Sequence, residues 1–535
     1  SPFVSVELLV FYPIYEKLKH QRKKEIKQQH GSFIVSMPGI LVLVLYIYEP
    51  KRQSHLQLAQ NKTMGQPPGP WTLPVIGSLH HIAGQLPHRA LRDIARRYGW
   101  PVMLLHLGEV PTLVVSSRSG AREVMKTHDA AFASRPLSST VRVLTNGGRD
   151  IIFAPYGDHW RMMRRIAVTE LLTARRVLSF RAIREQEVAA MLRAIAAGGE
   201  EVDMRTRLSA MVADSTVRAV MGDRCRDRDV FLREVDRANE LGRGFNLADL
   251  WPSSRLLVWA SGAVRRAEEC RDAVFGILDG IIVEHLERMD GVGDDDQDLI
   301  DVLLRIQKDG GSGLDMDSLK AVIFDIFAAG SETSSTTLEW IMAELVKNPK
   351  VMHRVTTEVR QAFGAGGTVV EEQLANLVPY LQLVIRETLR LHTPLPLLLP
   401  RECREEAGCR VLGYDVPQGT QVLVNAWALS RDERYWPDAP EEFRPERFEK
   451  SEVDFRGADF ELLPFGSGRR ICPGLAFGLA NVELALASLL LHFDWEAPGL
   501  DDPAGFDMTE AFGVTTRRKN GLVLRPVLRV PLPGV

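Results

Sequence analysis

Apolar residues recur at helical spacing along most of the chain, and short runs of strand-forming residues occur early and late. Strands are predicted at VMLLHLG and TLVVSS within residues 102–117, and at GTQVLVNAWAL and GLVLRPVLRVPL, residues 419–429 and 521–532. No repeat with a fixed period is present. The sequence therefore predicts a mainly α fold with small β-sheets, whose helices cover most of Asp158–Ala197, Asp229–Leu241, Ala260–Met289, Leu319–Lys347, Leu381–His392 and Leu475–His492.

The amino-terminal region is the least globular part of the chain. FIVSMPGILVLVLYIY is an uncharged run of 16 residues, just under the roughly 17–25 residues that a spanning helix needs. A buried core helix is the alternative, but the run lies between a basic segment and a polar linker, which favours a membrane anchor. We therefore expect an amino-terminal extension, an anchor, a linker with a proline-rich hinge and a large globular domain, over residues 1–32, 33–49, 50–70 and 71–535.

Composition narrows the class of protein. The chain has 535 residues, a formal net charge of -3 and 45% hydrophobic residues, which is ordinary for a large globular core and gives no reason to expect nucleic acid as a partner. Five cysteines, an odd number in so long a chain, argue against a disulfide scaffold. Cys403 and Cys409 could pair or join a metal site, but neither belongs to a CxxC motif, so we interpret both as structural or incidental.

One cysteine, Cys472, lies in an unusual loop, FGSGRRICPG, residues 465–474. Gly466 and Gly468 begin a dinucleotide-binding pattern, but Ile471 stands where the third glycine is needed and no βαβ unit surrounds the loop. The two glycines instead allow the backbone to turn close to a flat partner. The loop is therefore better explained by the chemistry of its thiol.

The residues around the thiol favour its charged form. Pro473 suits the first turn of the helical run that follows, so Cys472 lies at a helix amino terminus, where free N–H groups and the helix dipole stabilise a thiolate. Phe465 could shield the sulfur and Arg470 could bind an anion. A thiolate against a flat anionic partner describes haem ligation.

The complete spacing FxxGxRxCxG resembles the signature of the cytochrome P-450 family of haem-thiolate monooxygenases. The resemblance implies that Cys472 is the axial ligand of the iron of haem b. It also implies that the haem contacts are made by Phe465, Gly468, Arg470 and Gly474.

The resemblance extends from Pro67 to about Val530. PPGPWTLPVIGSLHHI, AAGSETSS, FRPERF and MTEAFGVTTRRK look like the plant microsomal branch, whose members oxidise specialised metabolites. This implies one large catalytic domain, residues 71–535, behind a membrane anchor on the cytosolic face of the endoplasmic reticulum. Electrons would come from NADPH through NADPH–cytochrome P-450 reductase. The basic residues before Phe33 depart from the family's pattern.

The segment FAAGSETSS, residues 327–335, lies inside a predicted helix. Gly330 in a helix interior costs about 1 kcal/mol relative to alanine. Close crossing of two helices would explain the glycine, but not a threonine directed inward. The resemblance implies that Gly330 and Thr333 flank bound O2. It also implies that Thr333 holds the distal proton relay, with Glu332 as its acidic neighbour.

Two further motifs match the family. ETLR and FRPERF would supply a buried ionic cluster of Glu387, Arg390 and Arg447, although a Glu–Arg pair three residues apart is ordinarily a solvated surface pair. In HWRMMRR, Trp160 and Arg164 share one helical face. The resemblance implies that these two residues, together with Arg470 and Arg401, bind the haem propionates.

Three apolar segments would line the distal pocket and favour a lipophilic substrate. A terpenoid is the first expectation, and an indole or phenylpropanoid-derived compound is the alternative. The pocket residues implied are Val141, Ile151, Phe153, Leu395, Leu397, Leu398, Phe512 and Val514, with Ala329 from the helix.

The expected reaction inserts one oxygen atom from O2 into the substrate. Two other readings remain: an isomerase or dehydratase that acts on a peroxide without activating O2, and a haem protein that senses or carries a ligand. The presence of Thr333 favours oxygen activation.

Overall fold

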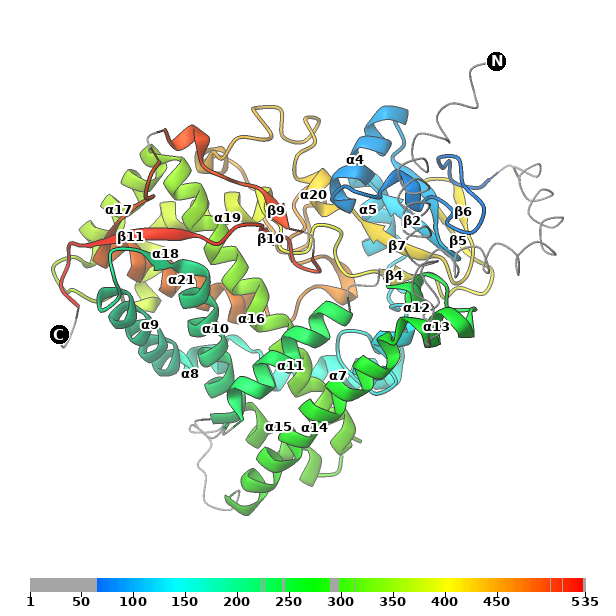
Figure 1. The fold of residues 1–535 in the computed structure, drawn as a ribbon, viewed down its shortest axis with the longest axis horizontal. Coiled ribbons are helices and arrows are strands. Elements are labelled where there is room, and N and C mark those ends of the chain that lie inside the picture. Colours follow the sequence, from blue (N-terminus) through cyan, green and yellow to red (C-terminus); the bar gives the residue numbers. More distant parts are fainter. Residues whose placement is uncertain are drawn as a thin grey trace, which may run out of the picture. The chain divides into compact units, whose positions relative to one another are not determined.

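The computed structural model describes residues 65–222, Cys225, 227–242, 246–288, 298–311, 313–500, 502–511 and 513–532 (Figure 1). The predicted extension, anchor and most of the linker lie outside these residues, and so does Phe512. Among the described residues, only α21 (Leu475–His492) is long and apolar enough to span a membrane, and 67% of it is buried within the protein.

The described chain is mainly helical, as the sequence predicted. The α-helices before the longest one are α4 (Pro87–Tyr98), α5 (Arg118–Arg122), α6 (Ser139–Leu144), α7 (Asp158–Ile166), α8 (Ala174–Ser179), α9 (Arg181–Ala196), α10 (Met204–Met221), α11 (Arg228–Leu241), α12 (Leu247–Leu250), α13 (Arg255–Ser261), α14 (Ala263–Arg288) and α15 (Leu299–Lys308). The longest helix and those after it are α16 (Met316–Lys347), α17 (Pro349–Phe363), α18 (Leu374–Leu377), α19 (Pro379–Leu391), α20 (Ala426–Leu429) and α21.

Four small sheets accompany the helices in the described chain. The largest has the order β1-β2-β7-β4, in which β2 and β7 run parallel and the other pairs antiparallel. The others are β3-β11-β8, β9-β10 and β5-β6. The strands are β1 (Val102–Leu107), β2 (Val110–Val115), β3 (Val202–Asp203), β4 (Arg401–Glu402), β5 (Cys409–Val411), β6 (Tyr414–Val416), β7 (Gln421–Val424), β8 (Phe493–Glu496), β9 (Glu510–Ala511), β10 (Arg517–Arg518) and β11 (Val523–Leu528).

The proline-rich segment packs on the largest sheet. The Leu104 N–H of β1 donates to the Pro68 carbonyl oxygen at 2.8 Å. A Cβ added to Gly69 would lie 2.1 Å from the Leu104 carbonyl oxygen, so only glycine fits there. Residues 65–70 therefore lie within the same compact unit as the rest of the domain.

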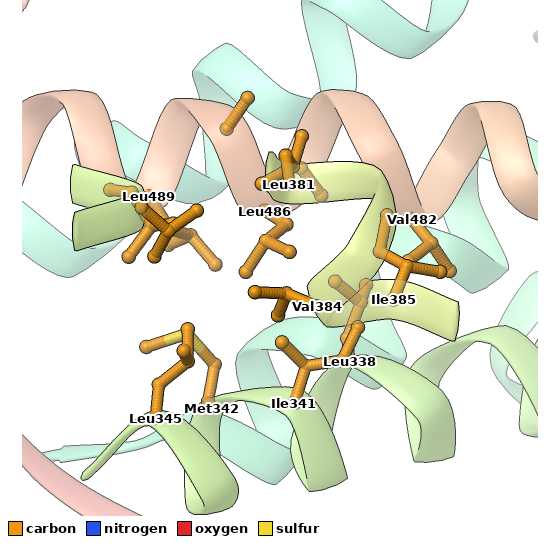
Figure 2. Close-up of a cluster of buried hydrophobic side chains, with 14 of the residues drawn as sticks. Leu338, Ile341, Met342, Leu345, Leu381, Val384, Ile385, Val482, Leu486 and Leu489 are labelled. Carbon is orange, nitrogen blue, oxygen red and sulfur yellow. The ribbon is translucent and has the colours of Figure 1, made fainter. Parts of the chain in front are cut away.

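Helices α16, α19 and α21 share one hydrophobic core (Figure 2). Each fully buried aliphatic side chain contributes roughly 1.5–3 kcal/mol relative to exposure. The contact fixes α16 against α19 and α21. The side chains that meet there are Leu338, Ile341, Met342 and Leu345 from α16, Leu381, Val384 and Ile385 from α19, and Val482, Leu486 and Leu489 from α21.

The helical pattern predicted across Asp158–Ala197 is broken in the structure. After α7 the chain forms a π-turn and leaves the helix at Leu172. The Thr173 hydroxyl then accepts the Arg176 N–H at 3.1 Å and caps α8. Apolar spacing alone cannot show this break, because the residues on either side keep the same period.

Candidate active site

A cavity of about 240 Å³ lies between α16 and the loop that precedes α21. Ala329, Gly330 and Thr333 line it from α16, and Phe465 and Cys472 line it from the loop. Motifs more than a hundred residues apart in the sequence thus meet across one space.

The loop is closed by its own backbone. The Cys472 N–H donates to the Phe465 carbonyl oxygen at 2.9 Å, and Gly466 lines the cavity with a left-handed φ of 71°. Gly468 has a different role from the predicted haem contact: a Cβ there would lie 2.2 Å from the Met125 carbonyl oxygen. This glycine allows the loop to pack on the chain behind it.

Cys472 has accessible surface and is among the residues that line the cavity. Burial raises the pKa of its thiol, while the Gly474 backbone N–H and the nearby Arg164 act in the opposite direction. A thiol placed in this way ionises when a cation binds it directly.

Four arginines, Arg135, Arg164, Arg401 and Arg470, line the same cavity. Burial lowers the pKa of each guanidinium, and repulsion from its neighbours lowers the pKa of Arg135 and Arg470 further, that of Arg470 to about 9. So many positive charges around one cavity favour an anionic ligand.

Protein partners satisfy only part of this charge. Arg401 donates to Asp129 Oδ1 at 3.0 Å. In the described chain, the Arg164 guanidinium has no hydrogen-bond partner, and the buried Arg135 Nε has none either. Arg135 was not predicted; its only signal in the sequence is a cation inside the apolar stretch AFASRPL.

Trp160 does not direct its polar atom to the cavity. Its indole N–H donates to the Ile151 carbonyl oxygen at 3.0 Å, and its ring lies 4.3 Å from the Arg470 guanidinium. Its cation–π contact therefore supports Arg470, which differs from the predicted direct contact with a propionate.

On the opposite wall, Thr333 faces the cavity from a continuous α16. Its hydroxyl donates to the Ala329 carbonyl oxygen at 2.7 Å, which leaves the oxygen lone pairs available to a ligand. A Cβ added to Gly330 would contact only Thr216 Cγ2, at 3.9 Å. Packing therefore does not require this glycine, and its missing side chain leaves space in the cavity.

Glu332 is directed away from the cavity. The Thr515 hydroxyl donates to its carboxylate, and the Asn239 amide lies 3.5 Å from the other oxygen. Glu332 thus lies behind Thr333, between α11 and the terminal loop, and is not among the cavity-lining residues.

The structure brings Glu387, Arg390 and Arg447 together in a buried cluster. Arg390 donates to both Glu387 oxygens at 2.7 and 2.8 Å, and Arg447 donates to one of them at 2.9 Å. Arg390 also donates to the backbone carbonyl oxygens of Ser430 and Pro440, at 2.6 and 2.7 Å. The two guanidinium charges share one carboxylate and are further hydrogen-bonded to backbone carbonyl groups, which lowers the cost of burying them.

A second cavity, of about 140 Å³, adjoins the first. Leu395 and Leu398 line both cavities, so the two share a wall. Ile151 and Ala329 line the first cavity only. The remaining predicted pocket residues in the described chain line the second: Val141, Phe153, Leu397 and Val514.

The cavity therefore suits a large anionic cofactor whose metal accepts a thiolate. A comparison of sequences agrees, because the family model described as cytochrome P-450 matches residues 67–525. The chain belongs to this family and is a monooxygenase. The predicted family, fold class and enzyme class are confirmed.

Several known proteins are similar over most of their length. Zealexin A1 synthase from Zea mays is 50% identical over 473 residues, which cover 87% of this chain and 93% of that protein. Dolabradiene monooxygenase from Zea mays is 50% identical over 472 residues, which cover 86% and 92%. A zebrafish cytochrome P-450 solved with abiraterone superposes with a TM-score of 0.69 at 27% identity, covering 83% of this chain and 99% of that one.

Proposed function

We propose that this protein inserts one oxygen atom from O2 into a terpenoid, with electrons supplied by NADPH through NADPH–cytochrome P-450 reductase. The observation that carries the proposal is the pairing of Cys472 with Thr333 on the walls of one cavity. That cavity adjoins a second one with mainly apolar residues. A thiolate ligand, a hydroxyl and an apolar space are the parts that such a reaction needs.

The haem fits the residues present, and when bound it supplies the iron that activates O2. Cys472 would ligate the iron. Arg135, Arg164, Arg401 and Arg470 would hold the propionates, since all four residues line the cavity. The Thr333 hydroxyl would hold a proton at the distal wall, with Glu332 as the acid behind it.

The lining of the second cavity favours an aliphatic substrate over a flat aromatic one. Phe153 is its only phenyl ring in the described part of the chain, so few surfaces are present on which an indole or phenylpropanoid ring could stack. The names of the two Zea mays relatives above refer to zealexin A1 and dolabradiene, which are terpenoids. Both observations support a terpenoid substrate.

We also propose that the catalytic domain lies at the cytosolic face of the endoplasmic reticulum membrane. Helix α13 supports this location, because it presents Leu256 and Trp259 to solvent, and Trp259 is 80% exposed. An exposed indole beside an aliphatic side chain suits the interfacial region of a membrane.

Reconstitution with the reductase tests the proposed reaction. We expect an oxygenated product from a panel of sesquiterpenes and diterpenes only when NADPH and O2 are both present, detected as a mass increase of one oxygen atom. Isotopically labelled O2 should transfer its label to the product. Turnover of a hydroperoxide without NADPH would instead indicate an isomerase or dehydratase, and binding without turnover would indicate a ligand carrier.

Thr333→Val keeps the shape of the side chain but removes the hydroxyl. We expect product formation to fall by roughly 10²-fold while NADPH oxidation continues, because proton transfer at a positioned group contributes at least this much. Thr333→Ser, which retains the hydroxyl, should recover most of the product. The ratio of product to NADPH consumed is the measurement, and equal ratios in the Val and Ser variants would contradict the proton role.

A further inference from the structure

Two buried aspartates lie beside the cavity and have no role in the reaction described above. Asp150 is fully buried and immediately precedes the segment Ile151–Ala154. Asp325 is 5% exposed and lies on α16, eight residues before Thr333. Burying one carboxyl group is costly without compensation, so two in the same place need an explanation.

The two carboxyl groups join the segment to the helix. Asp325 Oδ2 accepts the backbone N–H groups of Ile151 and Ile152, at 2.7 and 3.0 Å. Asp150 accepts the Phe153 N–H, at 3.0 Å to its nearer oxygen, and is in hydrogen-bond contact with the Asp325 carboxyl. Since a carboxylate has no donor, this last contact requires a proton between the two groups.

The segment so held forms part of the cavity wall. Ile151 lines the cavity, and its carbonyl oxygen accepts both the Trp160 indole N–H and an Arg470 N–H, at 3.0 and 3.1 Å. The Ile152 and Ala154 carbonyl groups accept further hydrogen bonds from Arg470. The position of this arginine therefore depends on the segment.

The charges around the pair favour one negative charge rather than two. Arg470 and Arg135 both interact favourably with Asp150. Burial nevertheless raises the pKa of Asp150 to about 6. Burial, and then the Asp150 charge, raise the pKa of Asp325 well above its usual range. The pair therefore favours a state with one proton between the two carboxyl groups, and it titrates as a unit.

We propose that Asp150 and Asp325 share one proton and that this pair fastens residues 150–154 to α16. Both aspartates are then positioning residues for Ile151 and Arg470 at the cavity. The inference rests on the haem-thiolate pocket of the proposed function, and it is independent of the substrate.

The direction in which the free energy of unfolding changes with pH follows from the number of protons that the folded and unfolded states bind. Above the ordinary carboxyl pKa of about 4, the folded protein holds a proton at this pair that the unfolded chain has already lost. The free energy of unfolding therefore decreases as the pH rises through the raised pKa of the pair. This fall is expected to begin at about pH 4, where the unfolded chain loses its carboxyl protons, and to end once the pH has passed the raised pKa of the pair.

Asp325→Asn is the decisive variant, because it keeps the hydrogen bonds of this side chain while removing its ionisable proton. The amide oxygen introduced by this substitution still accepts the two backbone N–H groups, and the amide NH2 donates to Asp150 without a shared proton. We expect the full-length holoenzyme to keep its melting temperature at pH 7 and to lose the decrease at higher pH. Asp325→Ala, which leaves both N–H groups unpaired, should melt several degrees lower at every pH. If the Asn variant melted as low as the Ala variant at pH 7, an ionised Asp325 would be required and the proposal would be wrong.

Infrared spectroscopy provides a second readout that does not depend on stability or turnover. A protonated-carboxyl band that shifts in heavy water is expected at pH 7 in the unaltered protein. Asp325→Asn and Asp150→Asn should each remove it, because an amide N–H then bridges the pair. Asp317→Asn, which alters an exposed aspartate on the same helix, should keep the band. Absence of the band from the unaltered protein would overturn the proposal, whether or not a terpenoid product forms.

Discussion

Replacing Cys472 with alanine is expected to abolish the thiolate-type spectrum of the reduced carbon monoxide complex and all NADPH-dependent oxygenation. Its sulfur is the one cysteine sulfur among the cavity-lining residues of the described chain. The hydrogen bond from the Cys472 N–H to the Phe465 carbonyl oxygen belongs to the backbone and survives the substitution. The loop should therefore keep its shape while the iron loses its anionic ligand.

Cys409→Ala is the matched control for this result. Cys409 is partly exposed on β5, and its sulfur makes a weak contact with the Arg410 carbonyl oxygen, at 3.9 Å, so its removal should leave the spectrum unchanged. Cys472→Ser separates charge from size, since a serine hydroxyl remains protonated where a thiol ionises. A thiolate-type spectrum that survived in Cys472→Ala would disprove the ligand assignment.

The second large effect is expected at Glu387. Glu387→Gln would leave the buried Arg390 and Arg447 without their shared countercharge, although both keep backbone acceptors. Removing one partner of a buried ion pair typically costs about 3–5 kcal/mol. We expect the variant to unfold at a markedly lower denaturant concentration and to yield little soluble haem protein.

An exposed ion pair is the control for the contribution of the buried cluster to the free energy of unfolding. Arg181 and Glu185 form an i,i+4 pair at 3.4 Å, with both side chains more than 40% exposed. Glu185→Gln should change the free energy of unfolding by no more than about 0.5 kcal/mol. Arg447→Lys, which keeps the charge and loses the planar fork, should lie between the two. Equal losses for Glu387→Gln and Glu185→Gln would show that the cluster does not contribute to stability through its buried charges.

The motifs with a fixed local spacing were predictable from the sequence. The chemistry of Cys472 follows from the glycines and proline within its own loop, and the Glu387–Arg390 pair is visible as an i,i+3 spacing. Both depend on neighbours along the chain. The helix that carries Thr333 was predictable for the same reason, because its apolar period continues on both sides of the motif.

Features that depend on distant segments were not predictable. The break at Leu172 depends on a threonine cap. The orientation of Glu332 depends on a hydroxyl from the terminal loop. The indole of Trp160 contacts a carbonyl group of the cavity wall. Arg135 and the Asp150–Asp325 pair were missed because each residue taken alone is an ordinary polar position. Only the fold shows that they are buried and which groups they contact.

The contact between Pro68, Gly69 and Leu104 sets a limit on where the chain can be shortened. A segment rich in proline and glycine looks like a dispensable tether, yet its backbone here accepts a hydrogen bond from β1. Removing residues 1–64 leaves that hydrogen bond intact, whereas removal through Pro70 takes away the acceptor of the Leu104 N–H. The start of the folding unit is thus defined by a hydrogen bond, and the end of the polar linker is a poor guide to it.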